Sequence, residues 1–226
     1  MIKIACAVAT AMSFASGAMA APIVLDFEGI GNLASVNDFY NGGTDSVGNR
    51  GTNYGINFSR TSLAIIDEDA GGRGNFANEP SASTVLFFLS GGAAMMNVAA
   101  GFSTGFSFFY SSSENGFINV FDGLNGTGNL LASLELDDNI DGCIGDPTGL
   151  YCRFDSIGVS FDGIARSVSF GGAADNIGFD NITLGSAVPG TPDPTDPTDP
   201  TDVPEPATLA LLGFGLAGLA GARRKR

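Results

Sequence analysis

The sequence predicts an all-β domain over residues 21–187, an antiparallel β-sandwich of jelly-roll type. No stretch in this range keeps a helical hydrophobic period. Short runs rich in β-branched and aromatic residues recur instead, separated by clusters of Gly, Asn, Asp and Ser, and roughly ten such runs suit a two-layer fold. Eighteen phenylalanines, in a chain without tryptophan, supply the bulk of the expected core.

The expected strands follow one another at intervals of roughly a dozen residues. Apolar and polar residues alternate most clearly in Phe117–Phe121 and Ile164–Phe170, which predicts strands with one buried face. The expected strands are Ile23–Phe27, Tyr54–Arg60, Leu63–Ile66, Thr84–Leu89, Met95–Ala99, Gly105–Ser111, Phe117–Phe121, Leu130–Leu136, Phe154–Phe161, Ala165–Phe170 and Ile177–Leu184.

Two segments are expected to lack regular structure. The glycine-rich region Gly29–Thr52 has little to bury and is predicted to be a long surface loop. Residues 188–202 form a linker in which proline recurs every third position from Pro194 to Pro200. This spacing favours extended polyproline II, and the interleaved aspartates repel one another, so the linker is expected to act as a stalk.

The first twenty residues have the pattern of a secretory signal peptide. A single cation, Lys3, precedes the mostly apolar run Ile4–Phe14, and Ala18-Met19-Ala20 is an A-x-A cleavage site. We therefore expect residues 1–20 to be removed between Ala20 and Ala21, and the mature chain to be exported.

The last twenty-four residues, 203–226, have three parts in a fixed order. Pro204-Glu205-Pro206 comes first, an uncharged apolar run over 207–222 follows, and Arg223-Arg224-Lys225-Arg226 ends the chain. At 1.5 Å per residue the run spans about 24 Å as a helix, slightly short of a ~30 Å hydrocarbon core. We expect a transmembrane helix whose basic end stays in the cytoplasm.

This tail resembles the PEP-CTERM sorting signal of Gram-negative bacteria that make exopolysaccharide; the same kind of tail is also known as an ice-binding-protein C-terminal domain. The resemblance rests on the order and terminal position of the Pro-Glu-Pro motif, the apolar run and the basic end. It implies an inner-membrane-anchored precursor that an exosortase cleaves near the motif and passes to the cell surface or extracellular matrix. The alternative is an ordinary membrane anchor that is never cut.

Charge and cysteines further restrict the partners of the mature chain. Residues 21–206 hold five arginines and all twenty-four acids, a formal charge of −19, so nucleic acid is not an expected partner. Cys6 leaves with the signal peptide, and Cys143 and Cys152 remain. In an oxidising compartment we expect these two to form a disulfide, because two thiols without histidine are too few for a metal site.

Two groups of oxygen donors are candidate sites for a structural Ca²⁺. Asp137, Asn139 and Asp141 stand at positions one, three and five of a D-x-N-x-D-G loop. Thr148, rather than glutamate, is at position twelve, so the loop is not an EF-hand, and a polar turn is the alternative. The terminal segments resemble the first and last strands of jelly-roll carbohydrate-binding modules, which implies a second Ca²⁺ site at Asp26, Glu28 and Asp180, with ordinary strand residues as the alternative.

Catalysis has little support in the sequence. Gly101-Phe102-Ser103-Thr104-Gly105 matches a nucleophile-elbow pattern, but the chain has no histidine, which excludes a Ser-His-Asp triad. A pair of carboxylates, as in glycosidases, is the remaining catalytic option. We therefore expect a structural or adhesive surface protein, not an enzyme, with exopolysaccharide as a candidate ligand; a carboxylate-dependent glycan hydrolase is the alternative.

Overall fold

The computed structural model describes residues 21–140, 143 and 149–190. Their regular structure is all-β and antiparallel, as predicted, apart from two short 3-10 segments. The strands are β1 (Ile23–Leu25), β2 (Ile56–Phe58), β3 (Leu63–Ile66), β4 (Thr84–Phe87), β5 (Ala93–Ser112), β6 (Gly116–Phe121), β7 (Leu130–Leu136), β8 (Asp155–Gly172) and β9 (Ile177–Leu184); the 3-10 segments are η1 (Phe39–Asn41) and η2 (Leu124–Gly126).

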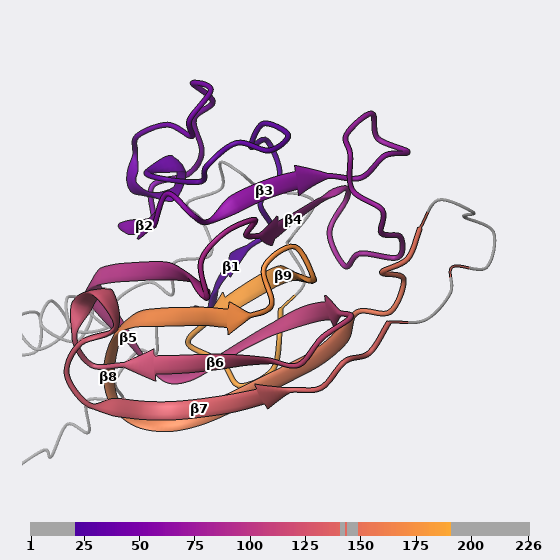
Figure 1. The fold of residues 1–226 in the computed structure, drawn as a ribbon. Helices are drawn as coiled ribbons and strands as arrows, with labels where there is room; N and C mark the ends of the chain where they lie inside the picture. The colour runs from indigo at the N-terminus through magenta and orange to yellow at the C-terminus, as the bar shows by residue number, and fades with distance from the viewer. Residues whose placement is uncertain (1–20, 141–142, 144–148, 191–226) are drawn as a thin grey trace, which may run out of the picture. The chain divides into compact units, whose positions relative to one another are not determined.

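Two long strands, β5 and β8, join the sheet together (Figure 1). The hydrogen-bonded order is β3-β4-β9-β5-β8-β6-β7, with β1 beside β9 and β2 beside β5. The first half of β5 pairs with β2 and with the end of β8, whereas its second half pairs with β9 and with the start of β8. The long strands thus belong to two half-sheets, one completed by β2, β6 and β7 and the other by β1, β3, β4 and β9.

The apolar faces of the two half-sheets pack against each other. The ring of Phe170, in the β2–β6–β7 half, lies 5.9 Å from the ring of Phe106 and 5.2 Å from that of Phe179, both in the other half. All three side chains are fully buried. This edge-to-face packing makes the domain sandwich-like and confirms that phenylalanine fills the core; the jelly-roll type stays a prediction.

Four of the expected strands are in fact two. The segments predicted as Met95–Ala99 and Gly105–Ser111 are both in β5, and those predicted as Phe154–Phe161 and Ala165–Phe170 are both in β8. The sequence predicts a turn at the glycines between the expected strands of β5, but Gly101 (φ 80°) and Thr104 (φ 75°) form an irregularity across which the pairing of β5 with β8 continues. A bulge of this kind bends a strand without ending it.

Apart from η1 and a bridge from Ser35 to Leu63, the region Gly29–Thr52 is irregular, as predicted, but the expectation that it has little to bury is wrong. Four of its large side chains are almost fully buried in the core: Ile30, Val36, Phe39 and Tyr40. The Tyr40 ring packs edge-on against Phe27, with 5.9 Å between centroids. These four residues therefore anchor the segment to the core, whereas Leu33 and Val47 stay exposed.

The predicted signal peptide and the predicted C-terminal sorting signal lie outside the described residues. This applies to the signal peptide up to Ala20, to most of the linker, and to the whole tail 203–226 with its predicted helix 207–222. In the part of the chain that the structure does describe, no helix is long and apolar enough to cross a membrane.

Candidate functional site

The terminal strands bring Asp26, Glu28 and Asp180 to one region, which we call the carboxylate corner. Asp26 and Glu28 follow β1, and Asp180 belongs to β9, the strand that β1 pairs with. Asp180 accepts hydrogen bonds from the backbone N–H and the hydroxyl of Ser81, each at 2.8 Å. Glu28 accepts from the backbone N–H groups of Ser83 and Thr84 at 2.9 and 2.8 Å. The two carboxylates thus connect the segment that leads into β4 with the terminal strands β1 and β9.

Burial changes the electrostatics of this corner. The pKa of Asp180 is raised to about 7: desolvation by burial is the main cause, the nearby charge of Glu28 adds to it, and hydrogen bonds from Ser81 oppose the rise. Burial likewise raises the pKa of Asp26. Beside Asp180, Asn181 is fully buried with φ 46°, and neither its Oδ1 nor its Nδ2 has a hydrogen-bond partner.

The corner shows only some of what a Ca²⁺ site needs. Its oxygens are hard donors of the kind that Ca²⁺ prefers. Within residues 21–140, 143 and 149–190, however, no three His, Cys, Asp or Glu side chains are grouped so as to hold a metal ion. The oxygens of Asp180 and Glu28 already accept protein hydrogen bonds. Ca²⁺ at this corner therefore stays a prediction.

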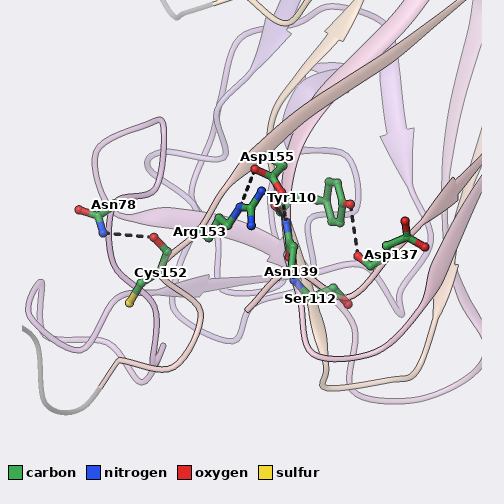
Figure 2. Close-up of polar contacts among 8 residues, drawn as sticks. All are labelled: Asn78, Tyr110, Ser112, Asp137, Asn139, Cys152, Arg153 and Asp155. Atoms are coloured by element: carbon green, nitrogen blue, oxygen red, sulfur yellow. Dashed lines mark hydrogen bonds and ion pairs between the residues drawn. The ribbon is translucent and has the colours of Figure 1, made fainter. Parts of the chain in front are cut away.

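In the predicted D-x-N-x-D-G loop, the Asn139 side chain is turned inward (Figure 2). It is 8% exposed, and its Oδ1 accepts from the Ser112 backbone N–H at 2.7 Å. Its Nδ2 donates to the backbone oxygen of Tyr110 and to Asp155, both at 3.1 Å. Asn139 thus binds the end of β5, so its amide oxygen is already engaged. Asp137 contributes its backbone oxygen to the Tyr110 hydroxyl at 3.2 Å, and Asp141 lies outside the described residues.

The predicted disulfide between Cys143 and Cys152 is present, with 5.3 Å between the two Cα atoms. It ties the loop that follows Asn139 to the segment that leads into β8. Asn78 donates a hydrogen bond to the backbone oxygen of Cys152 at 3.2 Å (Figure 2). The segment around Cys152 is therefore fixed both covalently and by a distant part of the chain.

A polar groove that the sequence analysis missed lies over β2, β5 and η2. Asn57 and Asn97 are directly opposite each other in the β2–β5 pair. Asn97 donates to the Oδ1 of Asn125 at 3.0 Å and accepts from the Asn125 backbone N–H at 2.7 Å. With Asn37, Asp38 and Arg60 these residues line an open groove of about 950 Å³, which we call the asparagine groove.

The sequence does contain a signal for this groove. Asn57 stands between Ile56 and Phe58, and Asn97 between Met96 and Val98, and all four apolar neighbours are buried. Because side chains alternate across a strand, the asparagines must lie on the outer face. The alternation does not predict the pairing register of β2 with β5, which places the two asparagines side by side.

The wall of the groove depends on Asp45. One of its carboxylate oxygens accepts from the backbone N–H groups of Val47, Gly48 and Asn49, at 2.7–2.9 Å. The other accepts from Gly31 N–H at 2.9 Å. Desolvation raises the pKa of Asp45, but these hydrogen bonds outweigh it and hold the pKa below its usual value.

The nucleophile-elbow pattern and the tyrosines are the remaining sequence candidates. Gly101–Gly105, which the sequence predicts to be a turn between two strands, lies within β5, so the nucleophile-elbow pattern is part of a strand. Tyr40 and Tyr110 are buried, whereas Tyr54 is 40% exposed and its ring stacks on Tyr40 at 6.1 Å. Tyr54 is thus the most exposed of these three tyrosines.

Comparison with known proteins identifies the tail. Residues 202–225 match the family model of the PEP-CTERM protein-sorting motif. The chain carries a PEP-CTERM sorting signal. None of the curated proteins matches the chain. A crystal structure of a glycoside hydrolase family 43 arabinoxylan arabinofuranohydrolase from Bacillus subtilis, in complex with cellotetraose, is 13% identical with a TM-score of 0.34. The match covers 63% of this chain but only 31% of that one, and so low a score supports no conclusion about fold or activity.

The PEP-CTERM signal determines the route of the protein. It indicates an exported protein that is made as a membrane-anchored precursor and processed by an exosortase. The matched range contains the Pro204-Glu205-Pro206 motif, the apolar run and all but the last of the four terminal cations. The β domain precedes this signal in the chain and is thus exported with it.

Proposed function

We propose that this PEP-CTERM protein is a structural or adhesive component of the cell surface or extracellular matrix, and that it binds exopolysaccharide in the asparagine groove. The row formed by Asn57, Asn97 and Asn125 carries the proposal. Each carboxamide offers two N–H donors and an acceptor oxygen, a combination that complements sugar hydroxyls. Asn57 and Asn125 are exposed, so their unpaired groups face the groove.

The charge of the mature chain limits the kind of polysaccharide. A formal charge of −19 over residues 21–206 repels polyanions. Arg60 is the cation that lines the groove, and Asp38 lines it too, so the described lining has no excess of positive charge. A neutral glycan is therefore the ligand that this surface suits best.

Binding without hydrolysis is the mode that the groove favours. Glycoside hydrolysis needs two carboxyl groups, one of which is kept protonated by its surroundings. Of the two carboxylates that line the groove, Asp45 is held ionised by its hydrogen bonds and is committed to the loop 46–49. Asp38 is then the one described lining carboxylate that is not committed to this loop, and a single carboxylate is not the pair that hydrolysis needs, which supports a binding module over the hydrolase alternative.

Ca²⁺ enters the proposal as a stiffening ion at the carboxylate corner. Of the two predicted sites, this one has support in the unpartnered amide oxygen of Asn181, whereas the amide oxygen of Asn139 is taken by Ser112. Asp26, Glu28 and Asp180 are the residues that would hold the ion there. Its role would be structural.

The test is electrophoresis of the purified full chain in gels that contain the exopolysaccharide of the producing bacterium. We expect retardation of the wild type and a clear loss of it in Asn57→Ala, because Asn57 is exposed and its removal leaves the fold intact. Asn119→Ala is the matched control, since this strand asparagine lies on β6 away from the groove lining. Equal retardation of both variants would refute the groove, and release of shortened sugars would favour the hydrolase.

A further inference from the structure

A second, much smaller cavity lies on the β3–β4–β9 half-sheet, under the segment 149–154. It has a volume of about 50 Å³ and a largely apolar lining: Ile65, Phe76, Val85, Phe87, Phe154 and Ile177. Phe76, Val85 and Phe87 are at most 5% exposed and do not belong to the main core cluster. The cavity thus lies mostly among apolar side chains outside the main core cluster, although Ile177 belongs to both, and it is far smaller than the asparagine groove.

The floor of this cavity carries an unsatisfied hydroxyl. Ser111 lines it, is fully buried, and its Oγ has no hydrogen-bond partner. Ser111 pairs directly with Gly178 across β5 and β9, and Gly178 also lines the cavity. Gly178 leaves its position on this wall without a side chain, and a Cβ added there would stand 3.3 Å from Val85 Cγ2. A buried hydroxyl without a partner is costly, and native proteins seldom keep one without a reason.

The cover of the cavity is fixed before any ligand arrives. Phe76 forms a bridge with Tyr151, and Asn75 accepts hydrogen bonds from the backbone N–H groups of Leu150 and Tyr151 at 2.6 and 3.2 Å. The adjoining Cys152 is held by its disulfide and by Asn78 (Figure 2). A pocket whose walls are tied down in this way has little ordering entropy to lose on binding.

We propose that this cavity binds the acetyl group of an acetylated sugar. An apolar cavity of about 150 Å³ accepts benzene, so one of 50 Å³ has room for only a few heavy atoms, about the size of an acetyl group. Its methyl group would pack among the apolar side chains, and its carbonyl oxygen would accept the free hydrogen bond of Ser111. Asn75 and Asp175 line the rim and are exposed, which places polar partners where the sugar ring would emerge.

Saturation-transfer NMR on the purified full chain tests this site, with N-acetylglucosamine, methyl 6-O-acetylglucoside and glucose as probes. We expect saturation of the acetyl methyl protons and none of glucose; the two acetylated probes distinguish an amide-linked from an ester-linked group. Ser111→Ala should weaken binding roughly five- to tenfold by removing one hydrogen bond. It should fold at least as stably as the wild type, because the hydroxyl it removes has no protein partner.

Two further variants make the result decisive. Gly178→Ala should abolish binding, because the added Cβ would stand 3.3 Å from Val85 Cγ2 in the cavity wall. Asn57→Ala, in the asparagine groove, should leave acetyl binding unchanged, which separates this proposal from the proposed function. Absence of transfer to both acetylated probes, equal transfer to glucose, or unchanged binding in Ser111→Ala would each overturn the proposal and leave water as the partner of the serine.

Discussion

Replacing Asn139 distinguishes a structural amide from a Ca²⁺ ligand. In Asn139→Ala the Ser112 N–H loses its acceptor and the backbone oxygen of Tyr110 loses a donor, both in a buried setting. A buried polar group without a partner costs about 1–3 kcal/mol, and a second lost hydrogen bond adds about 1 kcal/mol. We therefore expect the free energy of unfolding to fall by about 2–4 kcal/mol.

The substitution Asn139→Asp separates the two roles. It keeps the acceptor for Ser112 but removes the donor and places a carboxylate against Asp155, 3.1 Å away in the wild type. If Asn139 has a structural role, Asn139→Asp should lower stability at least as much as Asn139→Ala does. If Asn139 is a Ca²⁺ ligand, Asn139→Asp should keep its stability when Ca²⁺ is present. The double variant Asn139→Asp/Asp155→Asn should recover part of the loss, because an amide again faces a carboxylate.

Urea unfolding of the full chain, with Ca²⁺ and with chelator, measures these differences. Asp138→Ala is the control: no described hydrogen bond involves its side chain, and it should change stability by less than about 0.5 kcal/mol. The reasoning is refuted if Asn139→Ala unfolds like the wild type, or if Asn139→Asp with Ca²⁺ is as stable as the wild type.

Four further predictions concern other parts of the chain. Asp45→Asn should lower the free energy of unfolding by about 1–3 kcal/mol at pH 7. Because the pKa of Asp45 is lowered in the folded state, the stability that its carboxylate contributes is present above about pH 4 and is lost as the pH falls through the folded pKa. The urea unfolding curves of wild type and variant should therefore converge in acid. Phe170→Ala should cost about 3–5 kcal/mol in the same assay, since it empties the contact between the half-sheets; a loss below 1 kcal/mol would contradict that packing. Ca²⁺ should raise the thermal midpoint relative to chelator, and an unchanged midpoint counts against the carboxylate corner as an ion site. Intact mass of the mature exported protein should lack residues 1–20 and the apolar run 207–222; a retained run would favour an uncut anchor.

The roles of the predicted site residues depended on the tertiary structure. The resemblance to jelly-roll modules implies that Asp26, Glu28 and Asp180 meet at the terminal strands, and β1 does pair with β9. The hydrogen bonds that Glu28 and Asp180 accept come from Ser81, Ser83 and Thr84, in a segment more than fifty positions away. Asn139 fitted a metal-loop pattern equally well as a ligand or as a turn residue. Only the folded structure shows that its amide forms hydrogen bonds with the backbone of Tyr110 and Ser112 at the end of β5.

What the sequence by itself determined are features set by local or covalent patterns. The all-β class follows from short runs and alternation, the Cys143–Cys152 disulfide from the two cysteines left in an exported chain, and the route from the ordered parts of the tail. Each of these predictions depends only on residues that are neighbours in the sequence or on the number of cysteines.

The tertiary structure decided everything that depends on register. It determined that Gly101 and Thr104 bend one strand instead of separating two. It also set Asn57 beside Asn97, and Ser111 beside Gly178, from strands far apart in the chain. A shift of one position in either pairing would turn these side chains to the opposite face, so no local pattern can specify the groove or the cavity.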